Sequence, residues 1–176
     1  MLSRFPAKQD VIPVYAVIAS IAFGWSFVLF LWKLPSWLLF LQLDEILTIL
    51  AYVFSVNLLE SLGFLAFLLL LSFFLPAGLL KDKFVVRGGF ISLSVLGSIA
   101  IYINRYMENG QGFIKYFPVW MIATVFIAIL LCVISTRFSF FSSVILWLAD
   151  RLTVFLYILV PLSSISLGLV ILRGMF

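Results

Sequence analysis

The sequence contains no histidine and a single cysteine, Cys132. Histidine and cysteine supply most protein ligands for zinc, copper and iron–sulfur centres, and a disulfide within a chain needs two cysteines. Without histidine, a Ser-His-Asp catalytic triad is excluded as well. We therefore expect no metal site, no cofactor and no internal disulfide, and we assign no catalytic residue.

Charged residues are also scarce, at 10% of 176 residues, whereas 65% of the residues are hydrophobic. A soluble domain carries about 25% charged residues. The segment Val11 to Trp32 contains no Asp, Glu, Lys or Arg, and a helix needs roughly 20 apolar residues to cross a bilayer core about 30 Å thick. The composition predicts an all-α, polytopic integral membrane helical bundle that forms a single transmembrane helical domain over residues 1–176.

The first apolar segment is too long for the h-region of a signal peptide, which runs to about 15 residues, so we interpret it as a retained first helix. Ala16, Ser20 and Gly24 recur in it at every fourth position, which places three small residues on one helical face. Small residues let helix backbones approach closely in lipid. We expect this face to pack against another helix of the same chain, with a homodimer interface as the alternative.

After Trp32, the segment Lys33 to Trp37 is expected to end the first helix, because Pro35 disfavours helical geometry at the residue before it. From there to Leu80 two interpretations are open. One is a short interfacial stretch, 37–43, followed by a single long helix from about 44 to 76. The other is two shorter spans, about 37–58 and 62–80, joined by a turn at 57–63.

Basic residues favour the first interpretation, since Lys and Arg concentrate in cytoplasmic loops. With a cytoplasmic amino terminus, five helices place seven basic residues inside (Arg4, Lys8, Lys81, Lys83, Arg87, Arg137 and Arg151) and four outside (Lys33, Arg105, Lys115 and Arg173). Six helices would need an external amino terminus and would give a nearly even distribution. We predict about five transmembrane helices, with six as the alternative.

The remaining spans are expected at about 88–104, 118–136 and 152–172. Gly88 and Gly89 are interpreted as a tight start of the third span, and Pro118 as a first-turn residue of the fourth. Asn109, Gly110 and Gly112 predict a turn between them. The aromatic segment 138–149 is expected to be either an amphipathic helix at the cytoplasmic surface or the lower end of one long helix.

Glu60 is the residue that most strongly suggests a site, because the single-helix interpretation places it within or near the hydrocarbon. Asn57 and Ser61 share its helical face and extend it into a polar stripe. A charged group at the bilayer centre normally faces protein or water and finds a partner. Arg151 is the predicted partner, with Asp150 beside it, and these five residues form the candidate intramembrane polar site.

Other interpretations of these residues stay open. Glu60 is a proton- or cation-coupling carboxylate, a buried ion-pair member, or a turn residue in the two-span arrangement. Asp150 and Arg151 alternatively mark the cytoplasmic interface. Asp44 and Glu45 are interpreted as the N-cap and first turn of a helix rather than as an acid–base pair.

Three functions are compatible with this pattern. The leading hypothesis is a small non-enzymatic membrane protein that acts as a scaffold or regulatory component of a larger membrane assembly. The second is a solute or ion transporter component that uses an intramembrane carboxylate, and the third is a membrane enzyme acting on lipid or isoprenoid substrates. The expected partners are the lipid bilayer and a membrane protein or a second copy, not nucleic acid, in a bacterial or archaeal plasma membrane.

Overall fold

The computed structural model describes residues 6–75, 80, 83–106 and 113–174, which form five α-helices and no strand. The helices are α1 (Lys8–Phe40), α2 (Leu43–Phe74), α3 (Phe84–Tyr106), α4 (Phe113–Arg137) and α5 (Ser139–Gly174). Each is long and apolar enough to cross a membrane. The all-helical prediction is confirmed, as is a single helix over most of the 44–76 segment. The predicted turn residues Asn109, Gly110 and Gly112, and Pro76, lie outside the described residues.

The start of α2 lies close to its predicted position, but its cap is a different residue. Gln42, not Asp44, precedes the helix, and its backbone N–H donates a hydrogen bond of 2.9 Å to the Glu45 carboxylate. An acidic side chain three residues after the cap satisfies an N–H group that has no partner within the helix. Asp44 and Glu45 therefore belong to the first turn of α2, where negative charge is favourable.

The predicted end of α1 at Pro35 is wrong. The helix continues through Pro35 to Phe40, and it ends where the Leu41 N–H donates to the Trp37 carbonyl at 2.8 Å. A proline inside a helix removes one backbone hydrogen bond, and one lost bond does not terminate α1 this close to its end. Pro118 likewise lies inside α4, which begins earlier than predicted, at Phe113.

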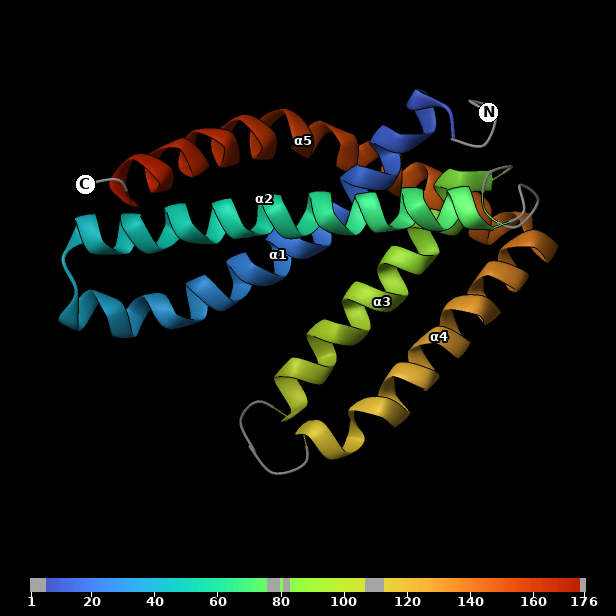
Figure 1. The fold of residues 1–176 in the computed structure, drawn as a ribbon, viewed down its shortest axis with the longest axis horizontal. Coiled ribbons are helices and arrows are strands. Elements are labelled where there is room, and N and C mark those ends of the chain that lie inside the picture. The colour runs from blue at the N-terminus through green and yellow to red at the C-terminus, as the bar shows by residue number, and fades with distance from the viewer. Residues whose placement is uncertain (1–5, 76–79, 81–82, 107–112, 175–176) are drawn as a thin grey trace.

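Figure 1 shows α1, α2 and α5 lying alongside one another, while α3 and α4 form a pair that diverges from them. The first helix contacts α2, α3 and α5, whereas α4 packs mainly on α3 and, less extensively, on α5. The connection at Leu41 and Gln42 and the carboxyl end of α5 lie at one end of the bundle (Figure 1). We call this the distal end, and the opposite end, where α1 begins, the proximal end.

The most completely buried residues lie toward the proximal end. Val14, Ile18, Leu68 and Phe84 are each at most 1% exposed, and they form one cluster with Leu80. The cluster joins the beginning of α1, the second half of α2 and the beginning of α3. The main apolar core is therefore a junction of three helices.

Gly88 and Gly89 lie beside this core, at the places where α3 crosses its neighbours. A Cβ on Gly88 would lie 3.2 Å from a methyl group of Val14 in α1, and a Cβ on Gly89 would lie 2.9 Å from a methyl group of Ile145 in α5. The two glycines thus let α3 approach two helices at once. The sequence interpretation of this pair as the start of a helix is wrong, because α3 already begins at Phe84.

The small-residue face of α1 is packed along only part of its length. Ala16 is fully buried, and the Ser20 hydroxyl is buried without a hydrogen-bond partner among the described residues. A Cβ on Gly24 would have no atom within 4 Å. The face is therefore occupied at Ala16 and open at Gly24.

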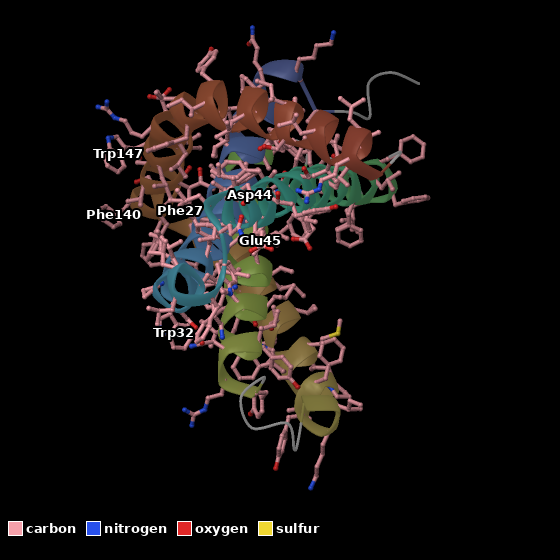
Figure 2. All side chains as sticks on the ribbon, turned by 90° about the vertical axis from the view of Figure 1, so that its left-hand side faces the viewer. Phe27, Trp32, Asp44, Glu45, Phe140 and Trp147 are labelled. Carbon is pink, nitrogen blue, oxygen red and sulfur yellow. The ribbon has the colours of Figure 1, made fainter. Side chains whose placement is uncertain are left out.

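The last helix is continuous, so residues 138–149 and 152–172 do not form separate elements. At 1.5 Å per residue, its 36 residues span about 54 Å, far more than the bilayer core of about 30 Å. Figure 2 shows that the early part of α5 runs at an angle to its later part.

Candidate functional site: a groove between α1 and α2

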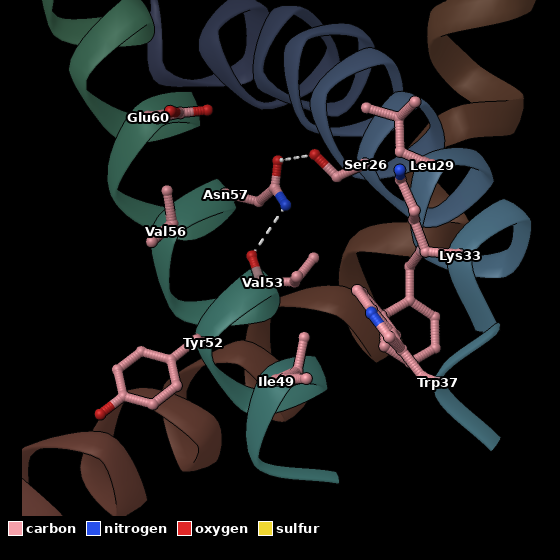
Figure 3. A pocket seen from close by; sticks show the side chains of 11 residues that line it. Ser26, Leu29, Lys33, Trp37, Ile49, Tyr52, Val53, Val56, Asn57 and Glu60 are labelled. Carbon is pink, nitrogen blue, oxygen red and sulfur yellow. Dashed lines mark hydrogen bonds between the residues drawn. The ribbon is translucent and has the colours of Figure 1, made fainter. Parts of the chain in front are cut away.

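A groove of about 460 Å³ lies between α1 and α2 (Figure 3). Only Leu41 and Gln42 connect the two helices. A residue of α1 therefore lies beside the residue of α2 that is equally far from this connection. The polar and aromatic members of the lining are Ser26, Lys33, Trp37, Tyr52, Asn57 and Glu60, and the aliphatic and phenyl members are Leu29, Phe30, Ile49, Val53 and Val56. A volume of this size lies within the usual range for small-ligand sites, about 300–1,000 Å³.

A hydrogen bond between α1 and α2 joins two of the residues that line the groove. The Ser26 hydroxyl donates to the side-chain oxygen of Asn57 at 2.9 Å, and the Asn57 amide nitrogen donates to the Val53 carbonyl at 2.7 Å (Figure 3). Asn57 is only 3% exposed. Its amide therefore joins α1 to α2, since a buried polar group stabilises the fold only when it is hydrogen-bonded.

Ser61 has a similar connecting position. Its hydroxyl donates to the Leu58 carbonyl at 3.0 Å and lies 3.3 Å from the hydroxyl of Tyr15 in α1. Ser61 is 1% exposed and does not line the groove. The polar stripe predicted from the sequence thus has two parts. Asn57 and Ser61 are buried and connect the helices, whereas Glu60 is exposed.

Glu60 is exposed and lies on the groove wall contributed by α2 (Figure 3). It follows the start of α2 by 17 residues, or about 26 Å along the axis, which is near the midpoint of a helix of 32 residues. In the part of the chain that the structure describes, no cation lies within ion-pair distance of its carboxylate. If α2 crosses a bilayer, this carboxylate lies near the centre.

The predicted contact between Glu60 and Arg151 does not form between the described side chains. The Arg173 guanidinium donates a hydrogen bond to the Thr48 hydroxyl. This contact shows how the antiparallel helices α2 and α5 are aligned, with Thr48 level with Arg173. In that register Glu60 lies level with Pro161, and Arg151 lies about ten residues, or roughly 15 Å, nearer the proximal end. Arg151 instead places its guanidinium 5.9 Å from the Trp147 ring centroid, and Asp150 and Arg151 are both exposed.

Lys33 is the groove residue that sequence reasoning missed, because we treated it only as a charge outside the first span. It lines the groove from α1, and its ammonium lies 5.9 Å from the centroid of the Trp32 ring. Figure 3 shows its side chain extending along α1 toward Ser26. Once Ser26 is known to contact Asn57 of α2, the seven-residue interval from Ser26 predicts that Lys33 lies on the same face of α1.

A second, apolar cavity of about 440 Å³ lies where α1, α2 and α5 meet. Its lining includes Ser20, Gly24, Phe54 and Phe155. Among the described residues, no group of three or more His, Cys, Asp or Glu side chains is placed to hold a metal ion. A third, smaller cavity of about 300 Å³ lies between α2 and α5 and includes Arg173. The α1–α2 groove contains both a carboxylate and an ammonium group, and it is the candidate functional site.

Comparisons of the chain with protein-family models, with curated proteins and with solved structures found no match. A function for this protein therefore has to be argued from its own residues and geometry.

Proposed function

We propose that this protein is a non-enzymatic, multi-pass integral membrane protein that acts as a scaffold or regulatory component of a larger membrane assembly. We place it in a bacterial or archaeal plasma membrane with the amino terminus, and hence the proximal end, in the cytoplasm. This orientation is proposed from the basic residues near the proximal end, among them Lys8, Lys83 and Arg87, since such residues concentrate on the cytoplasmic side.

The observation that carries the proposal is the exposed carboxylate of Glu60 in the open α1–α2 groove. A charged side chain at the bilayer centre costs at least about 2.5 kcal/mol on insertion scales unless it faces water or a partner. Lys33 lines the same groove, but its backbone lies about ten residues, or roughly 15 Å, nearer the distal end than Glu60. A polar or basic residue of another subunit, or of a second copy of this chain, would relieve the cost at Glu60.

The assembly is tested by the mass of the complex extracted from native membranes in a mild detergent. We expect the wild-type chain to migrate in a complex larger than its own 19.9 kDa and its detergent micelle. Glu60→Lys should release most of the chain as monomer, because it places a cation where the partner is expected to supply one.

Asp44→Asn is the matched control, since it removes an exposed carboxylate from the distal end of the same helix. It should leave the complex intact. A wild-type chain that is monomeric in the extract would contradict the assembly itself, and a complex that survives Glu60→Lys would exclude the groove as its contact.

The groove also favours a second candidate function, in which Glu60 carries a proton or cation in a transporter component. Ser26, Asn57 and Lys33 supply further polar groups in the same groove, as a translocation path requires. Proton flux or solute uptake by the chain in proteoliposomes, abolished by Glu60→Gln and retained in Asp44→Asn, would support this function. Proteoliposomes that show no flux above protein-free vesicles would count against it.

A further inference from the structure

The first part of α5 exposes a stripe of aromatic and basic side chains. Phe140, Val144, Trp147 and Arg151 follow one another at intervals of four, three and four residues, and all four are exposed. Such intervals place side chains on one face of a helix. On other faces of the same segment, Ile145 is 2% exposed and contacts α3 near Gly89. The exposed stripe therefore points away from the rest of the bundle.

The length of α5 places this stripe outside the hydrocarbon. Residues 152–172 are enough to cross the bilayer core by themselves, so the segment 139–151 extends about 20 Å beyond them along the helix. Figure 2 shows this early part of α5 turned to one side, with Phe140 and Trp147 on its outer surface. A segment that continues beyond the hydrocarbon core of the bilayer lies at the level of the lipid headgroups.

The charge of the stripe comes from Arg151. Its guanidinium lies 5.9 Å from the centroid of the Trp147 ring, and no ion pair joins it to a carboxylate of the described residues. Asp150 is exposed as well, but adjacent residues project about 100° apart around a helix, so its carboxylate points away from the stripe. Arg151 thus retains its hydrogen-bond donors for an anion outside the chain.

The proximal end as a whole, where the stripe lies, is also basic. The proximal end contains Lys8, Lys83 and Arg87 as further described cations, against Asp10 and Asp150 as described carboxylates. Clusters of Lys and Arg beside a membrane helix attract anionic lipids. This complementarity favours an anionic lipid over a zwitterionic one.

We propose that residues 139–151 of α5 bind an anionic phospholipid, with Arg151 contacting the phosphate and the rings of Phe140 and Trp147 lying against the lipid in the headgroup region. A guanidinium binds phosphate with two parallel hydrogen bonds, and tryptophan is enriched at the membrane–water interface. The aromatic stripe is the reason to choose a lipid over free phosphate, because an inorganic ion would leave these rings uncovered. The inference does not depend on the assembly or on transport.

The test uses the full chain, purified in a neutral detergent, whose thermal unfolding is followed as lipid is added. Phosphatidylglycerol should raise the unfolding temperature at a lower mole fraction than phosphatidylcholine, and inorganic phosphate should leave it unchanged. Arg151→Gln should raise the mole fraction of phosphatidylglycerol needed for half of the effect about five-fold, which corresponds to about 1 kcal/mol. Arg151→Lys, which keeps the charge, should retain most of the response.

Lys115→Gln is the matched control, because Lys115 also lies close to an aromatic ring, 5.7 Å from the centroid of Tyr116, but at the start of α4, the opposite end of that helix from α5. It should leave the response to phosphatidylglycerol unchanged. Equal responses to the two lipids, an equal loss in Lys115→Gln, or a response to phosphate alone would each overturn the proposal. If Arg151→Gln does not fold, Trp147→Leu provides the second variant and should weaken the response to both lipids; an unchanged response would also overturn the proposal.

Discussion

The junction of α1, α2 and α3 and the fourth helix are packed in opposite ways. Phe84 at the junction is 1% exposed, whereas Phe126 in α4 is 65% exposed. Of the described side chains of α4, only Ala128 and Ser135 are buried. Both regions are similarly apolar in sequence, so apolar composition does not distinguish a helix that forms the core from one that faces outward.

The difference between the two regions lies in how their contacts are made. At the junction, glycine and large apolar residues fit together, as Gly88 does with Val14. The contact of α4 with α3 includes polar and aromatic groups. The Trp120 indole N–H donates to the Ser98 hydroxyl at 2.6 Å, Thr124 lies 2.5 Å from that same hydroxyl, and the Tyr102 and Trp120 ring centroids are 5.3 Å apart.

The largest expected effect tests the junction against α4 with the same substitution. Phe84→Ala should lower the free energy of unfolding on the order of 3 kcal/mol, the lower end of the range for a buried phenylalanine, since the unfolded chain also remains in a lipid-like environment. Phe126→Ala should change it by less than about 0.5 kcal/mol, as is usual for an exposed position. Unfolding in mixed detergent micelles measures both, and equal losses would remove the distinction between the regions.

A smaller effect is expected at the crossing of α3 and α5. Gly89→Ala places a Cβ 2.9 Å from an Ile145 methyl group, and such overpacking costs about 1–3 kcal/mol. Gly97→Ala in the same helix meets no atom within 4 Å, and should stabilise the protein by about 0.5–1 kcal/mol through helix propensity. The two alanines should therefore shift the unfolding temperature in opposite directions, and a shift in the same direction would contradict the close crossing.

The smallest effect is expected in the polar contact between α3 and α4. Ser98→Ala removes the acceptor of the Trp120 N–H and should cost about 0.6 kcal/mol, the average for hydrogen bonds between membrane helices. Ser94→Ala removes only a bond to the Phe90 carbonyl of its own helix and should cost less. If Ser98→Ala costs no more than Ser94→Ala, then aromatic packing alone holds α4.

Only part of the candidate site followed from the sequence, since Asn57 and Glu60 line the groove, whereas Ser61, Asp150 and Arg151 do not. The polar periodicity of α2 grouped Asn57, Glu60 and Ser61, of which Asn57 and Ser61 are buried and Glu60 is exposed. The position of Glu60 relative to Arg151 required the register of α2 against α5. That register is visible in the Arg173–Thr48 contact, which joins residues far apart in the chain. Lys33 enters the groove for a comparable reason, because Pro35 does not end α1 and the hairpin turns only at Leu41 and Gln42.

The sequence by itself determined that the chain forms long helices able to cross a membrane, and its charge distribution favoured one helix over two in residues 44–76. The lengths of the apolar segments and the positions of the charged residues are enough to predict these helices, because a segment that crosses a bilayer must satisfy its own backbone hydrogen bonds. Only the tertiary structure decided which small residues lie at close crossings, Gly88 and Gly89 and not Gly24, and which charges share a groove. Nearly every face of these helices is apolar, so the choice among faces depends on how neighbouring side chains fit together, and hydrophobic periodicity does not report that fit.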